Sequence, residues 1–272
     1  TYYITHGVGD NAAKSAAKRY SEWWCDRFDR VIAPTAKTEN LLRQYGVEAP
    51  IDIIPSGMDL RRFSPSLHSE EERASVRAEC GVPEGKRVLL YIGRLAKEKN
   101  MEKILRVFPE LLRRCPDVQL VIIGEGPLKQ TLQEQAEAMG IRESVSIVGA
   151  KPWEEIDRYY AIGDVFVSAS HSETQGLTYI EAAASGLLGV FEDGVSAVLS
   201  GETDEQLLES LVLSFSPVGT RIRRNAVTAA EPYSTEQFAK RVEACYQAAI
   251  EAHNGALAEP QIIFYKETRG GF

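Results

Sequence analysis

The stretch that decides the fold is "RVLLYIGRLAKEKNMEKILRVFPELLRRCPDVQLVIIG", residues 87–124. It opens with an apolar run at 87–93 and closes with a second one at 118–124. Between them, residues 100–115 carry apolar side chains at helical spacing, which predicts a helix that Pro109 kinks. A strand, a helix and a strand with short connections predict a right-handed βαβ unit.

The same alternation continues toward the C-terminus. The further elements that we predict are a helix at 127–140, strands at 144–149 and 164–170 with a helix between them, and a helix from Leu177 onward. Pro127 suits the first turn of its helix and Gly140 the end of it. The pattern predicts an α/β, doubly wound, Rossmann-like domain with a parallel sheet, from about residue 85 to about residue 215.

The two ends of the chain have a different character. Residues 12–30 predict a helix with basic and aromatic side chains, and 31–53 predict a strand, a helix and a second strand. This resembles the tail of one α/β unit leading into the next. An amphipathic helix is predicted at 234–253, and "QIIFY" (261–265) is strand-like without a clear place in the fold.

Composition narrows the class of protein. The chain has 272 residues, is 44% hydrophobic and carries a net charge of -8, which argues against broad nucleic-acid binding. The four cysteines form no CxxC pair and the histidines no HExxH motif, so neither a zinc site nor a disulfide framework is indicated. Reduced thiols favour a cytoplasmic enzyme.

Ligands of open parallel sheets bind beyond the carboxyl ends of the strands. After the strand at 87–93, Gly93 lets the chain turn closely past a ligand, and Arg94 and Lys99 offer two cations beside a helix start. They suit a diphosphate, although two solvated surface cations would have the same sequence. The Gly-x-Gly at 124–126 lacks a third glycine, so we interpret it as a tight strand-to-helix turn.

A second strand end carries "SHSETQGLTYIEAAASG", residues 170–186. Glu173 lies in the loop after the strand, and Gly176 precedes a helix whose first N–H groups can bind phosphate oxygens. Glu181 lies about one turn further into that helix, where it could accept hydrogen bonds from a diol such as ribose. The alternative is one solvated glutamate and one glutamate on a helix surface.

Several stretches together resemble the family 4 retaining glycosyltransferases, which have the two-Rossmann (GT-B) architecture. They are "VIAPT" (31–35), "IDIIPSGMDLRRFSP" (51–65), "LLYIGRLAKEKN" (89–100), "LVIIGEGPLKQTL" (120–132) and "DVFVSASHSETQGLTYIEAAASG" (164–186). The resemblance covers about 31–190, and the helix at 234–253 also fits it. The wording "ETQGLTYIEA" is most similar to bacterial enzymes that glucosylate diacylglycerol.

The resemblance implies a set of site residues. Arg94 and Lys99 would hold the donor diphosphate and stabilise the leaving nucleotide, and Glu173 would contact the donor sugar. These three would be the catalytic residues. Donor-binding residues would be Gly93, Arg94, Lys99, Glu173, Gln175, Gly176, Leu177 and Glu181, with the Gln175–Leu177 backbone on phosphate or sugar and Glu181 on the ribose. The family needs no metal in this role, and no cofactor is implied.

The implied activity is transfer of a hexose, most simply glucose from UDP-glucose, to an acceptor such as diacylglycerol or glycosyl-diacylglycerol. The protein would be cytoplasmic, with peripheral contact to the inner membrane face. The implied domains are 1–65, a remnant of the acceptor-side domain with the linker; 66–233, the donor domain; and 234–272, the crossover helix and tail. The acceptor domain would be largely absent, and Ser56 stands where the family has asparagine.

Other classes of function stay open at this stage. A nicotinamide-dependent oxidoreductase would need a fuller GxGxxG, and a glycoside hydrolase would need two carboxyl groups facing one bond. A non-catalytic domain that binds nucleotide sugars is also compatible with a short chain. The helix at 12–30 could lie on anionic lipid or pack between domains.

Overall fold

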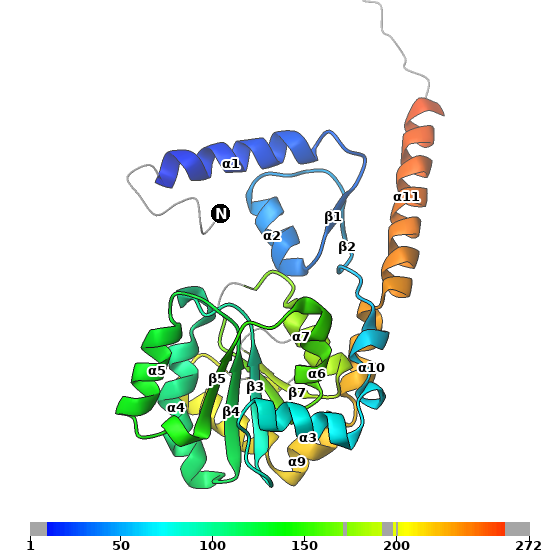
Figure 1. Ribbon diagram of the computed structural model, residues 1–272. Coiled ribbons are helices and arrows are strands. Elements are labelled where there is room, and N and C mark those ends of the chain that lie inside the picture. Colours follow the sequence, from blue (N-terminus) through cyan, green and yellow to red (C-terminus); the bar gives the residue numbers. More distant parts are fainter. Residues whose placement is uncertain (1–9, 171–172, 192–197, 200, 259–272) are drawn as a thin grey trace, which may run out of the picture. The chain divides into compact units, whose positions relative to one another are not determined.

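The computed structural model describes residues 10–170, 173–191, 198–199 and 201–258 (Figure 1). The chain divides into two compact units. The smaller unit contains residues 1–55 and 238–272, and the larger unit contains residues 56–237. The chain therefore passes from one unit to the other after Pro55 and returns after Gln237.

In chain order, the elements are α1 (Asp10–Cys25), β1 (Val31–Ala33), α2 (Ala36–Gln44), β2 (Ile51–Ile53), η1 (Leu60–Phe63), η2 (Pro65–Leu67), α3 (Glu70–Glu79), β3 (Arg87–Ile92), η3 (Lys97–Lys99), α4 (Met101–Arg114), β4 (Val118–Ile123), α5 (Lys129–Ala138), η4 (Arg142–Ser144), β5 (Val145–Gly149), η5 (Trp153–Glu155), α6 (Ile156–Tyr160), β6 (Val165–Ser168), α7 (Leu177–Ala184), β7 (Leu188–Phe191), β8 (Val198–Leu199), α8 (Asp204–Ser214), α9 (Pro217–Arg223), α10 (Ala226–Ala230), η6 (Glu231–Tyr233) and α11 (Thr235–Ala258).

The larger unit is built on a parallel sheet with the strand order β5-β4-β3-β6-β7-β8. β3 and β4 pair in register from Arg87 opposite Val118 to Ile92 opposite Ile123. Both strands read as continuous apolar runs because helices cover both faces of the sheet. The predicted doubly wound α/β architecture is confirmed.

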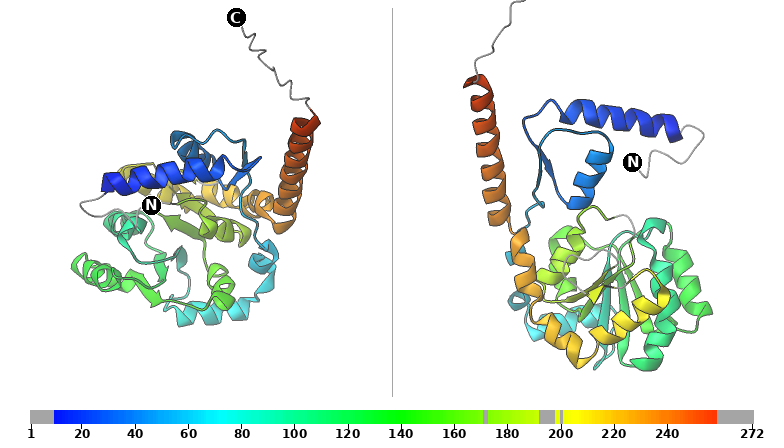
Figure 2. Two further views of the ribbon diagram at one scale, coloured as in Figure 1. Left: turned by 90° about the horizontal axis from the view of Figure 1, so that it is seen from above. Right: turned by 180° about the vertical axis from the view of Figure 1, so that it is seen from behind.

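Two hydrophobic cores flank this sheet. Figures 1 and 2 show α4, α5 and α8 on one face and α3, α6, α7 and α10 on the other. Successive residues of β3 alternate between the two cores: Leu89 packs with α4 and α8, whereas Leu90 packs with α6 and α7. The sheet is thus held from both sides, and its strand ends are the places left for a ligand.

One helix start differs from the prediction. α5 begins at Lys129, after Pro127, so Pro127 does not form its first turn. The reason is a tertiary contact: the Leu128 amide donates to the Leu95 carbonyl at 3.1 Å, which holds this turn against the chain that follows β3. The helix predicted at 100–115 is present as α4 and continues past Pro109.

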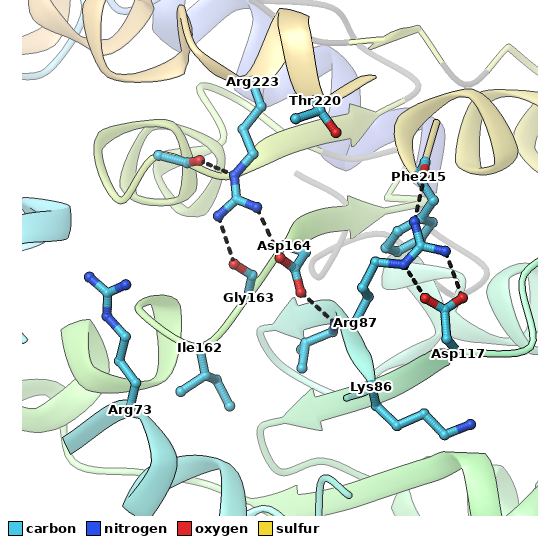
Figure 3. Close-up of polar contacts among 12 residues, drawn as sticks. Arg73, Lys86, Arg87, Asp117, Ile162, Gly163, Asp164, Phe215, Thr220 and Arg223 are labelled. Atoms are coloured by element: carbon cyan, nitrogen blue, oxygen red, sulfur yellow. Dashed lines mark hydrogen bonds and ion pairs between the residues drawn. The ribbon is translucent and has the colours of Figure 1, made fainter. Parts of the chain in front are cut away.

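The amino ends of the strands are joined by arginine–carboxylate contacts (Figure 3). Arg87, at the start of β3, donates through Nε and Nη2 to the two oxygens of Asp117 at 2.5 and 2.6 Å. Asp164, just before β6, accepts from the Val88 amide at 2.8 Å and from Arg223 at 2.9 Å. These contacts fix the order and spacing of the strands at this edge.

In the smaller unit, β1 and β2 pair in parallel. Arg30 donates two hydrogen bonds to the Asp52 carboxylate, at 2.6 and 2.8 Å, and the Cys245 thiol of α11 donates to the same carboxylate at 3.2 Å. α1 ends at Cys25 rather than at residue 30 as predicted. Just beyond that end, the Asp26 carboxylate accepts from the Glu48 and Ala49 amides. The segment 261–265 lies outside the described residues.

Candidate active site

The candidate site lies where the strand order reverses. β3 leads outward through β4 to β5 on one side, and the chain then crosses to β6, which pairs with β3 on the other side. In an open α/β sheet, the crevice at such a reversal, beyond the carboxyl ends of the strands, is where ligands bind. Gly93 and Arg94 follow β3, and the loop that carries Glu173 follows β6. The two predicted strand ends are therefore neighbours.

Lys99 and Glu173 meet across this reversal. The Lys99 ammonium donates a hydrogen bond to Glu173 Oε1 and forms an ion pair with it, although the two residues are 74 positions apart. The side chains are only 23% and 19% exposed. Water screens such a pair less than a surface pair. The contact joins a cation from one strand end to a carboxylate from the other.

Arg94 is held by Glu98, which was not among the predicted site residues. Its guanidinium pairs with Glu98 four residues ahead, and the Tyr91 hydroxyl donates to the Arg94 carbonyl at 3.0 Å. Burial alone would raise the pKa of Glu98, but its own backbone amide, Arg94 and Lys99 together lower it. Glu98 therefore stays charged between the two predicted diphosphate ligands.

Gly176 fixes the start of α7. Its backbone is left-handed, with φ 68°, and an added Cβ would lie 2.5 Å from the ring of Tyr179. Only glycine fits such a position without displacing a neighbour. The helix then begins at Leu177, which is exposed, and its first N–H groups follow directly after the loop that carries Glu173.

Gln175 connects this loop to a distant part of the same unit. Its side-chain oxygen accepts from the Ser56 amide at 2.8 Å, and its side-chain nitrogen donates to the Ser56 carbonyl at 3.2 Å. Only the backbone of Gln175, and not its side chain, was predicted to belong to the site. The partner of its side chain is 119 residues away, which no local pattern reveals.

Glu181 lies deeper than the other predicted residues and is 4% exposed. The Tyr160 hydroxyl, from α6, donates to its Oε2 at 2.6 Å. Burial raises the pKa of Glu181, while Tyr160 and the charge of Arg62 act in the opposite direction. A carboxylate has two oxygens with several acceptor positions, so this contact leaves acceptor capacity for a ligand.

The Gly-x-Gly at 124–126 serves chain packing. A Cβ at Gly124 would lie 1.8 Å from the Gly93 carbonyl oxygen, and one at Gly126 would lie 2.2 Å from that of Leu95. Both glycines therefore let the chain after β4 approach the chain after β3. The interpretation as a tight turn is confirmed.

Two family models match the sequence: "Glycosyl transferases group 1" over residues 72–204 and "Glycosyltransferase Family 4" over residues 2–62. Alpha-monoglucosyldiacylglycerol synthase of Acholeplasma laidlawii is 30% identical over 272 residues, covering 94% of this chain and 68% of that protein. The chain belongs to glycosyltransferase family 4.

Two other proteins are similar over large parts of the chain. The alpha-monoglucosyldiacylglycerol synthase of Streptococcus pneumoniae is 34% identical, covering 83% of this chain and 53% of that protein. The D-inositol 3-phosphate glycosyltransferase of Segniliparus rotundus is 30% identical, covering 86% and 55%. The chain thus spans about half to two thirds of the length of these relatives.

Solved structures confirm the predicted GT-B fold. HepE of Anabaena, crystallised with UDP and glucose, superimposes with a TM-score of 0.73 at 18% identity, covering 86% of this chain and 67% of that one. Sucrose-phosphate synthase of Thermosynechococcus elongatus gives 0.71 at 20% identity, covering 87% and 62%. At these identities the likeness concerns the fold.

The described part of the chain lacks two other kinds of feature. Within residues 10–170, 173–191, 198–199 and 201–258, no three His, Cys, Asp or Glu side chains gather as metal ligands would. In the same ranges, no helix has the length and apolar character that crossing a bilayer requires.

Proposed function

We propose that this family 4 member takes a hexose from a nucleoside-diphosphate sugar, with UDP-glucose as the donor, and transfers it with retention of configuration. The observation that carries the proposal is the Lys99–Glu173 ion pair at the strand reversal, beside the start of α7. A cation, a carboxylate and the first N–H groups of a helix in one place match the diphosphate and hydroxyl groups of such a donor.

The diphosphate would be held by Arg94 and Lys99. Charge builds up on the leaving nucleotide as the sugar–phosphate bond breaks, and cations fixed beforehand stabilise that charge without reorganising. Both side chains already pair with carboxylates, Glu98 and Glu173. When the donor binds, Lys99 would leave Glu173 and pair with the phosphates. The sugar hydroxyls would then donate to the released Glu173 carboxylate. Gly93, at the end of β3, allows the close approach.

The remaining contacts would orient the nucleotide. The backbone of Gln175, Gly176 and Leu177 would donate to phosphate or sugar oxygens at the start of α7. Glu181 would accept from the ribose hydroxyls, with Tyr160 holding one of its oxygens at 2.6 Å. Retention is supported by the resemblance of the Glu-x7-Glu segment to retaining enzymes, whose front-side mechanism requires no enzyme nucleophile.

The proposed acceptor is a glycerolipid, diacylglycerol or a glycosyl-diacylglycerol. The support is the pair of alpha-monoglucosyldiacylglycerol synthases among the relatives. Such an acceptor would require peripheral contact with the inner face of the membrane by a cytoplasmic protein. A nicotinamide-dependent oxidoreductase is not favoured, because Gly124 and Gly126 pack closely against the backbone that follows β3.

The test begins with calorimetric titration of the chain with UDP, UDP-glucose and NADH, followed by transfer assays on vesicles that contain diacylglycerol. We expect UDP and UDP-glucose to bind, NADH to give no heat of binding, and the product to keep the α configuration in its NMR spectrum. Transfer should continue in EDTA. Binding of NADH alone, or a loss of transfer in EDTA that magnesium restores, would overturn the proposal.

A further inference from the structure

The loop that carries the proposed donor residues is fastened to the point where the chain enters the larger unit. Ser56 is the first residue of that unit. Gln175 closes a two-point contact on its backbone, accepting from the amide at 2.8 Å and donating to the carbonyl at 3.2 Å. A side-chain amide is the group that can donate and accept at once, so the residue type matches the contact.

The segment after Ser56 is in turn fastened to the place where the chain leaves the unit. The Met58 amide donates to the Tyr233 carbonyl at 2.9 Å, and the Thr235 amide donates to the Met58 carbonyl at 3.0 Å. Met58 and Ser234 thereby form a parallel bridge, close to the exit after Gln237. Entry and exit are one hydrogen-bonded structure, which we call the crossing (residues 56–58 and 233–235).

We propose that Gln175 is a positioning residue that links the donor loop to the crossing, so that a nucleotide bound at Gly176 stabilises the hydrogen bonds of Met58 and Thr235. This inference rests on the proposed function, because it takes the nucleotide to bind at the start of α7. Gln175 adjoins Gly176, whose left-handed backbone starts α7. A ligand that restrains Gly176 also restrains Gln175, and through its side chain Ser56.

The geometry separates this role from a purely structural one. Gln175 is partly exposed and Ser56 is exposed. Neither belongs to the buried apolar clusters on the two faces of the sheet. Losing two exposed hydrogen bonds leaves the core intact, so the variant should fold. The link, rather than the fold, is what the substitution removes.

The experiment measures amide hydrogen exchange in the 272-residue chain with and without saturating UDP. In the parent chain, we expect UDP to slow exchange at Ser56, Met58 and Thr235 by about fivefold, the scale of one net hydrogen bond. Gln175→Met keeps the length of the side chain and removes both polar groups. At a UDP concentration that saturates this variant, as calorimetry verifies, it should show less than about a twofold response at Met58 and Thr235.

Two further variants sharpen the comparison. Gln175→Glu keeps the acceptor for the Ser56 amide but loses the donor, so its response should lie between those of the parent chain and Gln175→Met. Gln130→Met is the matched control, because Gln130 makes an exposed hydrogen bond to Glu134 within α5 and is not part of the donor loop. It should respond to UDP as the parent chain does.

The outcomes separate this inference from the proposed function. If UDP binds and Gln175→Met abolishes the response at the crossing, the link is established. If UDP binds but Met58 and Thr235 do not respond, or respond equally in Gln175→Met, the link is overturned and the donor site stands. If UDP does not bind the parent chain, both fall.

Discussion

The two edges of the large sheet both carry cations and carboxylates, but they pair them differently. At the amino edge, Arg87 grips both oxygens of Asp117 and also donates to the Phe215 carbonyl at 2.5 Å (Figure 3). At the carboxyl edge, Lys99 contacts one oxygen of Glu173. A forked contact fixes direction as well as distance, whereas an ammonium is a point charge that can change partner.

The difference explains how one sheet can be rigid and still bind a ligand. Asp164 accepts the Val88 amide and the Arg223 guanidinium together, and Arg223 also donates to the Gly186 carbonyl at 2.7 Å. These groups join three segments of the backbone. At the other edge, Arg94 and Lys99 pair with side chains, Glu98 and Glu173, which can turn away without moving a strand. We therefore expect substitutions at one edge to change stability and at the other to change activity.

The largest effect should come from the two cations. If Arg94 and Lys99 act on one leaving group, each alanine variant should lose about 10²–10³-fold in kcat, the usual scale for a preorganised donor, with kcat/KM falling in parallel. Because they share a target, the double variant should cost less than the sum of the singles. A double-mutant cycle with UDP-glucose checks this, and circular dichroism controls for folding. Small, strictly additive effects would place both residues outside the site.

Glu173→Ala should come next. Each charge-assisted hydrogen bond to the sugar contributes about 1.5–3 kcal/mol, so we expect a loss of at least about tenfold in transfer rate. The melting temperature should stay close to that of the parent chain, because the ion pair between Glu173 and Lys99 joins two side chains. Rates near the parent value in a folded Glu173→Ala variant would remove this residue from the site.

The amino edge predicts the opposite result. Asp164→Ala leaves the Val88 amide and Arg223 without their shared acceptor. We expect a loss of about 1–3 kcal/mol in the free energy of unfolding, with an unchanged Kd for UDP. Asp164→Asn keeps an acceptor for the amide and should lose less. Urea denaturation and calorimetry measure the two quantities. A weaker affinity for UDP with normal stability would contradict the division between the edges.

The sequence predicted the frame well, because buried parallel strands leave a strong pattern. β3 and β4 appear in the sequence as continuous apolar runs. Because ligands bind beyond the carboxyl ends of parallel strands, the sequence alone predicts that Arg94, Lys99 and Glu173 lie at one edge of the sheet. What the sequence could not predict depends on tertiary contacts. The observed start of α5 differs from the predicted one because the Leu128 amide donates a hydrogen bond to the Leu95 carbonyl, which joins two loops.

The contacts of the site residues could not be predicted from the sequence either, because they also depend on tertiary packing. Tyr160 and Glu181 are 21 residues apart on different helices, and neither position has a local pattern that marks the other. Gln175 and Ser56 lie still further apart. Residue type and strand position identify candidates for a site, whereas the partners that orient each candidate come from packing.

The smallest effect concerns Glu181. This residue combines the two roles that the edges of the sheet divide, because it is buried and is also proposed to bind the donor. Burial raises the pKa of Glu181 above the ordinary 4.5, so the folded chain binds a proton more tightly there than the unfolded chain does. Stability from this group is then fully present below pH 4.5 and is lost as pH rises through the folded pKa. Glu181→Gln keeps an acceptor for Tyr160 and cannot ionise. At pH 7.5 Glu181→Gln should therefore melt at a slightly higher temperature than the parent chain, and the difference in melting temperature should disappear in acid.

If the carboxylate binds ribose, the same variant should raise the donor KM a few-fold with little change in kcat, the pattern of uniform binding loss. Melting curves across pH and steady-state kinetics test both halves. A normal donor KM with a sharply lower kcat would reverse the roles of Glu181 and Glu173, and a parent chain that melts higher at every pH would mean that the charged carboxylate is stabilised where it lies.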